Sequence, residues 1–219
     1  MADYSEEEQV EMIRNWWAAN GVGVIVAIVV AVAALLGWRQ WQGYQGEQGH
    51  EASTLYQEMT TSLETMRGVD AAQAEQAKQV VEQSAERLLA DFSDSAYADY
   101  ASLTLARLAV ESGDYASAVA HLQRVVNDPE SDSLKWVATL RLARVQVQLG
   151  EYDAAQALLS GNVPAAFEGQ VQELKGDILF ALDDIEGARK AYGAALESTE
   201  GEAQRELVRM KLQDLAPAS

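Results

Sequence analysis

The sequence predicts an all-α protein, with a single N-terminal transmembrane helix, a solenoid of helix pairs and a C-terminal capping helix. Three observations lead to this prediction. No charged residue lies between Arg14 and Arg39. The remaining chain is rich in Ala, Leu, Gln and Glu, with only three prolines and almost no β-type alternation. Finally, a short helix–turn–helix motif recurs along this second part, which is typical of repeat proteins.

Residues 1–14 form a short acidic tail before the apolar stretch. The run Ser5–Glu8 has the form of a capping box, with Ser5 at the N-cap and an acid three residues later. Val10, Ile13 and Trp17 follow at helical spacing. We therefore expect a short helix that leads into the membrane. A docking peptide for a partner in the same compartment is the alternative.

Residues 15–41 are the predicted transmembrane helix. Its centre, from Gly21 to Gly37, contains no polar residue. Between the flanking arginines it would be about 36 Å long as a helix, enough to cross a hydrocarbon core of roughly 30 Å. The acidic start argues against a cleaved signal peptide, and the lack of a polar face argues against a buried core helix. Tryptophans flank both ends, as expected for interfacial anchors: Trp16, Trp17, Trp38 and Trp41.

Small residues recur on one side of the predicted span. Gly23, Ala27 and Ala31 are four residues apart, and such ridges let transmembrane helices approach closely. We expect them to pack against another helix, although a generic anchor of Ala, Val and Gly has the same composition. Charge does not decide the orientation of the span, because Arg14 on one side is matched by Arg39 on the other.

Residues 42–50 are a predicted juxtamembrane linker, polar and dotted with glycine, which is either a hinge or a continuing helix. Residues 51–219 are the predicted soluble domain. Its first part has two helical patterns, 51–66 and 71–91, separated by a break at residues 68–70. We expect these two helices to form a divergent first unit of the solenoid.

The repeat is visible when the chain is aligned with itself. The segment Gly113–Ala118 recurs at Gly150–Ala155 and again at Asp183–Ala188, with spacings close to the 34 residues of a tetratricopeptide repeat. Residues 127–129 and 162–164 are predicted turns between repeats. Small residues precede each motif and large ones follow it in register, as two closely packed helices require: Ala106, Ala143 and Gly176, then Leu122, Leu159 and Tyr192.

Residues 202–215 are the predicted capping helix, because a repeat array must cover its last apolar face. Val208, Leu212 and Leu215 share one side of this helix. We expect that side to pack on the last repeat. The charged residues are expected elsewhere on the helix: Glu202, Arg205, Arg209 and Lys211.

No combination of residues predicts catalysis, a metal site or a cofactor. Cysteine is absent, and the two histidines, His50 and His121, lie far apart in sequence and are expected at the surface. Sixteen basic residues against thirty-four acidic ones give a net charge of −18, which argues against nucleic acid and anionic lipid surfaces as partners. We therefore expect a non-enzymatic protein.

A concave surface is the binding site that such repeats offer, and it is lined by the first helix of each pair. Arginine and aromatic side chains there would suit extended or partly unfolded polypeptide, although several could instead stabilise neighbouring repeats. The basic pattern that clamps a terminal carboxylate is not evident in the sequence. Register places these residues on the face: Tyr100, Leu103, Arg107, Val110, Val137, Leu140, Arg144, Val147, Gln170, Glu173, Asp177 and Phe180.

Several stretches resemble the YfgM-like ancillary subunits of the bacterial SecYEG translocon. The resemblance covers nearly the whole chain and is poorest over residues 51–91. It lies in the segment Ala19–Gly21, in Gly37–Trp41 and, most specifically, in the helix Leu140–Leu149. Asp183 departs from the pattern, because a turn glycine is usual at that position. The segments Lys175–Asp177 and Gly187–Arg189 add to the resemblance.

The resemblance implies an inner-membrane protein with a cytoplasmic N-terminus and a periplasmic repeat domain. It further implies association with the translocon and with a membrane-anchored periplasmic chaperone of the prolyl-isomerase type, the pair handling emerging secretory proteins. A second implied role is a regulatory adaptor that sequesters a stress-response regulator through the cytoplasmic side. A structural subunit that only stabilises a partner complex is a third possibility.

Overall fold

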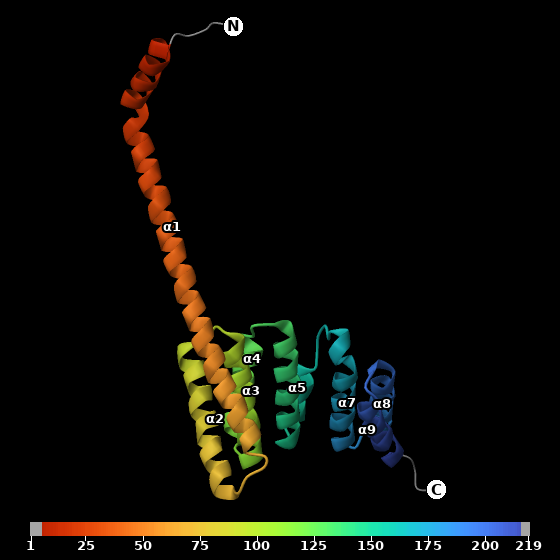
Figure 1. Cartoon of the computed structure of the whole chain (residues 1–219). Coiled ribbons are helices and arrows are strands. Elements are labelled where there is room, and N and C mark those ends of the chain that lie inside the picture. Colours follow the sequence, from red (N-terminus) through yellow and green to blue (C-terminus); the bar gives the residue numbers. More distant parts are fainter. Residues whose placement is uncertain (1–5, 216–219) are drawn as a thin grey trace. The chain divides into compact units, whose positions relative to one another are not determined.

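Helices form all the regular secondary structure in residues 6–215, the part of the chain that the computed structural model describes (Figure 1). The chain divides into two compact units, one ending at Glu51 and the other beginning at Ala52. The predicted N-cap at Ser5 lies outside the described residues.

The first unit is formed by the N-terminal part of α1 (Glu6–Thr65). Within it, Val10–Arg39 is long and apolar enough to cross a membrane, and a stretch of 18 residues inside it has a mean hydropathy of 2.6. Its large apolar side chains are exposed, among them Val22 and Leu35. Because water would disfavour so much exposed apolar surface, a lipid environment is the physical explanation of this helix. The predicted span of residues 15–41 stays a prediction.

The predicted small-residue ridge is exposed on this helix. Gly23, Ala27 and Ala31 have no covering group, and a Cβ added at Gly23 would meet nothing within 4 Å. Gly21 differs, because the Trp17 ring one turn earlier covers it. The ridge is therefore open to a neighbouring helix, and its packing role stays a prediction.

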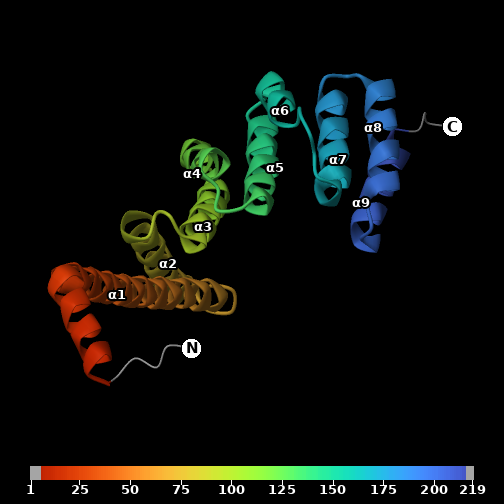
Figure 2. The same cartoon turned by 90° about the horizontal axis from the view of Figure 1, so that it is seen from above.

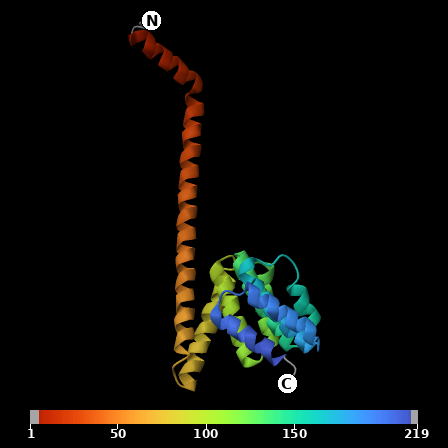
Figure 3. The same ribbon diagram turned by 90° about the vertical axis from the view of Figure 1, so that its right-hand side faces the viewer.

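Residues 42–50, the predicted linker, are helical and belong to α1. Of the two alternatives, the structure has the continuing helix, which ends only at Thr65. The predicted break at residues 68–70 is confirmed, and Asp70 caps α2 (Ala71–Asp91) by accepting bonds from two backbone N–H groups. Figure 3 shows α2 beside the C-terminal part of α1. Their shared core also takes in residues of α3 (Ala96–Ser112): Ala52, Leu55, Met59, Val81, Ala85, Leu88, Ala101, Leu105 and Leu108.

Successive helix pairs follow in the order α3–α4, α5–α6 and α7–α8 (Figure 2). The remaining bounds are α4 Tyr115–Asn127, α5 Asp132–Gln148, α6 Tyr152–Leu158, α7 Ala165–Ala181, α8 Ile185–Ser198 and α9 Glu202–Asp214. All three predicted motif turns are confirmed, since Gly113, Gly150 and Asp183 occupy the left-handed region with φ of 79°, 78° and 65°. Aspartate tolerates this conformation less well than glycine.

Small and large residues face each other inside each pair, as the register predicted. Ala106 and Leu122 are buried in one core cluster, and Ala143 and Leu159 in the next. In the third pair the sizes change together, because Gly176 lies directly against the ring of Tyr192 and a Cβ there would overlap it. The third pair therefore accommodates its larger ring by omitting the facing methyl group.

Helix α6 is the irregular member of the array. It has 7 residues, whereas α4 has 13 and α8 has 14. The segment that follows contains Gly161 with φ of 119° and ends at Pro164, the N-cap of α7, and both residues are unfavourable inside a helix. The spacing from Gly150 to Asp183 is 33 residues, against 37 from Gly113 to Gly150, because α6 is shorter than α4. Leu159 nevertheless keeps its buried position.

Helix α9 closes the array. Val208 and Leu215 are buried in its last core cluster, and Leu212 packs against them, as predicted. Two of its charged residues also make contacts inside the protein. Lys211 lies against α7 and forms ion pairs with Glu173 and Asp177, and Arg205 donates to the Thr199 carbonyl. The capping helix therefore packs on the last repeat through ion pairs as well as through apolar contacts.

Candidate polypeptide-binding groove

A hollow of about 390 Å³ lies between α3, α4 and α5, and we call it the arginine groove. Apolar side chains and three guanidinium groups line it together. The position of Arg107 in α3 corresponds to that of Arg144 in α5, six residues before the turn glycine in each case. The lining residues are Ala106, Arg107, Val110, Glu111, Leu122, Arg141, Arg144 and Val145.

The three arginines of this groove differ in their partners. Arg107 donates to Glu111 one turn later, at 2.7 Å. Arg141 and Arg144 form no ion pair with a carboxylate among residues 10–39 and 49–215, whose side chains the structure describes. Partial burial, together with the neighbouring charges of Arg144 and Arg107, lowers the pKa of Arg141. The groove therefore holds positive charge that the described protein does not neutralise, in a chain of net charge −18.

Four of the predicted face residues pack into the protein to different extents. Leu103 and Leu140 are buried in core clusters, so in this structure they stabilise neighbouring helices and are closed to a ligand. Val137 and Val147 are half-buried against the same clusters. For the two leucines, the alternative of a packing role is the one that the structure shows.

The more open predicted residues lie at several positions along the array. Tyr100 is exposed and its ring centre lies 5.6 Å from that of Tyr56 in α1. Val110 and Phe180 occupy equivalent positions, three residues before their turns, and are 38 % and 52 % exposed. Arg107 and Arg144 reach the arginine groove. These residues leave an accessible apolar and cationic surface.

The third repeat has the opposite charge at the face, and the capping helix covers it. Glu173 is only 5 % exposed and accepts from Lys211 at 2.7 Å and from Gln204. Asp177 accepts from Lys211 at 2.8 Å and from the Tyr192 hydroxyl at 2.7 Å. Burial of the ammonium opposes its charge, but these carboxylates outweigh that effect and raise the pKa of Lys211. Glu173 and Asp177 are therefore used inside the protein.

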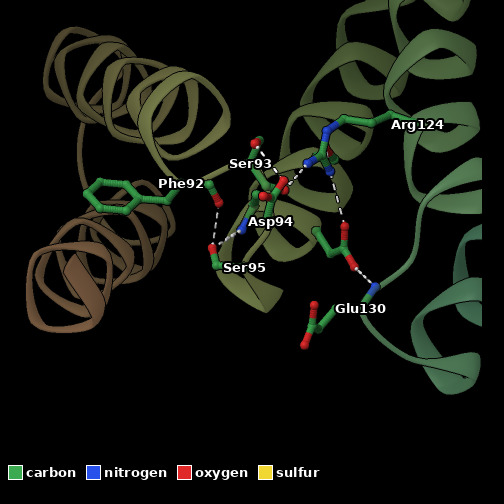
Figure 4. A network of polar contacts seen from close by, with 9 residues as sticks. Phe92, Ser93, Asp94, Ser95, Arg124 and Glu130 are labelled. Carbon is green, nitrogen blue, oxygen red and sulfur yellow. Dashed lines mark hydrogen bonds and ion pairs between the residues drawn. The ribbon is translucent and has the colours of Figure 1, made fainter. Parts of the chain in front are cut away.

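A second polar network joins α3 and α4 to the segments before α3 and α5 (Figure 4). Arg124 of α4 bonds to the buried carboxylate of Asp99 at 3.1 Å and to the Ser93 carbonyl at 2.7 Å. The other Asp99 oxygen accepts from the Glu130 backbone N–H at 2.8 Å. These bonds join the turn before α3, helix α4 and the loop before α5. They hold α3 and α5, which carry the groove arginines, to the same scaffold.

Arg141 is the groove residue that sequence reasoning missed. It lies three residues before Arg144 on α5, so the two side chains share one helix face. That spacing could have identified it in the sequence. The proximity of Arg107 could not be identified in this way, because it depends on how α3 packs against α5.

Among the described residues, no group of three or more His, Asp or Glu side chains is arranged to hold a metal ion. His121 is half-buried on α4. Burial and the charge of Arg124 lower the pKa of His121. This histidine is not among the residues that line the arginine groove.

Comparison with known sequences gives the family. The family model of the tetratricopeptide repeat-like domain matches residues 14–217. Curated relatives named "Ancillary SecYEG translocon subunit" are 32% identical in Haemophilus influenzae and 33% identical in Escherichia coli. The matches cover 96% and 97% of this chain, and 97% of each relative. The chain belongs to this family. No solved structure matches it significantly.

Proposed function

We propose that this protein is a non-enzymatic scaffold tethered in the bacterial inner membrane beside the SecYEG translocon. The similarity to the ancillary translocon subunits supports the proposal most directly, because it covers both the apolar helix and the repeats. A single apolar helix, Val10–Arg39, fits a single-pass inner-membrane protein. In the proposed topology, residues 1–14 are cytoplasmic and the repeats are periplasmic.

The repeat domain, in this proposal, binds secretory polypeptides as they emerge and hands them to a membrane-anchored periplasmic chaperone of the prolyl-isomerase type. Tethering holds the domain close to the channel exit, so that contacts too weak for free proteins become effective. The accessible apolar and cationic residues of α3, α5 and α7 provide the contact surface.

The test of the tether is co-purification of the translocon from membranes. The full chain should retain the translocon, and residues 42–219 exported without the anchor should lose it. Undiminished co-purification by residues 42–219 would contradict the need for the tether. Photo-crosslinking probes at Ala31, Arg107 and Arg144 then locate each partner, with the channel expected at Ala31 and chaperone or nascent chain at the arginines.

A matched pair of anchor variants separates tethering from a specific helix contact. Leucine at Gly23, Ala27 and Ala31 preserves an apolar span but fills the small-residue ridge. Leucine at Val22, Val26 and Val30 leaves the ridge intact. If the ridge packs against the channel, the first variant loses crosslinks and the second retains them. Equal behaviour would assign the span to anchoring alone.

The regulatory adaptor stays a prediction from the resemblance. It requires that deletion of residues 1–14 remove the stress-response phenotype while changes in the repeats leave it intact. The opposite pattern would support the scaffold.

A further inference from the structure

We propose that the arginine groove binds an aspartate or glutamate side chain of an extended polypeptide, with an adjacent apolar residue of that polypeptide seated beside it. This inference rests on the proposed function, since it names the chemistry of the segment that the repeat surface takes. Three features of the groove support it: its charge, its apolar wall and its continuation along the array.

The charge of the groove selects a carboxylate. Arg141 and Arg144 project from one face of α5, and Arg107 comes from α3, so guanidinium groups from two helices surround one hollow. Of these three arginines, only Arg107 has an acid partner among the described side chains, Glu111. Burial, followed by repulsion from Arg144 and Arg107, lowers the pKa of Arg141, and a bound anion would relieve the repulsion. Arginine also presents paired donors that match the two oxygens of a carboxylate.

The wall of the groove selects an apolar neighbour for that carboxylate. The apolar lining residues are Ala106, Val110, Leu122 and Val145. A volume of about 390 Å³ accommodates a few side chains, and a free inorganic anion would leave the apolar part unfilled. A polypeptide segment supplies both chemistries from adjacent residues.

The continuation of the surface selects an internal segment over a chain end. Val110, Val147 and Phe180 hold the same register position in α3, α5 and α7, and Phe180 is more than half exposed. Exposed apolar surface is therefore found at this position in α3 and α7, while Val147 is half-buried. Residues on either side of the bound acid would lie along it.

The experiment uses the full chain in nanodiscs of neutral phosphatidylcholine and a fluorescent peptide. The peptide is blocked at both ends and carries one glutamate between leucines. Its glutamine counterpart should bind about tenfold or more weakly, because the charge-assisted hydrogen bonds are lost. The double variant Arg141→Gln, Arg144→Gln should weaken the glutamate peptide to the same degree and leave the glutamine peptide unchanged. Arg67→Gln, an exposed arginine outside the groove, is the matched control and should bind as the wild type does.

Several outcomes would overturn the inference. One is an equal affinity of the wild-type protein for the glutamate and glutamine peptides. Because this comparison uses no variant, a folding defect cannot obscure its result. Tighter binding of a glutamine peptide with a free C-terminal carboxylate assigns the groove to chain ends. Displacement of the glutamate peptide by short-chain phosphatidylglycerol assigns it to lipid headgroups.

Translocon co-purification separates this inference from the proposed function. The double variant should retain the translocon while it loses the acidic peptide. A wild-type protein that binds the acidic peptide but does not co-purify the translocon contradicts the proposed function alone. A wild type that co-purifies it and binds both peptides equally contradicts the inference alone.

Discussion

Two regions of the repeat array carry opposite charges at the same position. Six residues before the turn, α3 has Arg107 and α5 has Arg144, whereas α7 has Asp177. Arg144 forms no ion pair with a carboxylate in the described part of the chain, while Asp177 is bonded to Lys211 and Tyr192. A position on the face of the repeats is therefore not enough to make a residue available for binding. The face is available only where no capping helix covers it.

Removing Lys211 from the capping helix should have the largest effect on the free energy of unfolding. Lys211→Met retains most of the apolar stem but leaves Glu173, 5 % exposed, without its ion-pair partner. We expect a loss of about 3 kcal/mol in the free energy of unfolding, because a buried charge is left uncompensated. Urea unfolding followed by circular dichroism measures it. Adding Glu173→Gln should recover much of the loss; a single variant with the wild-type midpoint would show that the pair contributes nothing.

Filling the space opposite Tyr192 should have an intermediate effect on the free energy of unfolding. Gly176→Ala introduces a methyl group that overlaps the ring, and such overpacking costs about 2 kcal/mol. The double variant Gly176→Ala, Tyr192→Leu recreates the Ala–Leu pair of the first two repeats. If size matching is the cause, Gly176→Ala should cost clearly less in the Tyr192→Leu background than in the wild type, measured by the same unfolding cycle. Equal costs in both backgrounds would contradict it.

Introducing a glycine at the third motif turn should have the smallest effect on the free energy of unfolding. Asp183→Gly removes the penalty of a left-handed aspartate, φ 65°, and we expect a gain of about 0.5 kcal/mol. Gly150→Ala is the reverse change. A Cβ there meets nothing within 4 Å, so its expected cost of about 1 kcal/mol is due to the backbone alone. A shift of both midpoints in the same direction would contradict this explanation.

The sequence was most informative where structure depends on local residues. The three turns, the buried Ala–Leu positions and the capping helix follow from spacing, and the structure confirms them. It was least informative where helices meet. Leu103 and Tyr100 lie one turn apart on α3, yet one is buried and the other exposed. Lys211 could not be assigned to Glu173, because that pair depends on how α9 crosses α7.

The matched sizes of Gly176 and Tyr192 bear on how such an array can grow. If a gene duplication copied only α5 into the place of α7, Ala143 would bring its methyl group against the tyrosine ring. Copying α5 together with α6 would bring Leu159 along and keep the fit. The two-helix pair is therefore the smallest segment that can be duplicated, shuffled or transplanted without a clash, and a designer extending this array should exchange whole pairs.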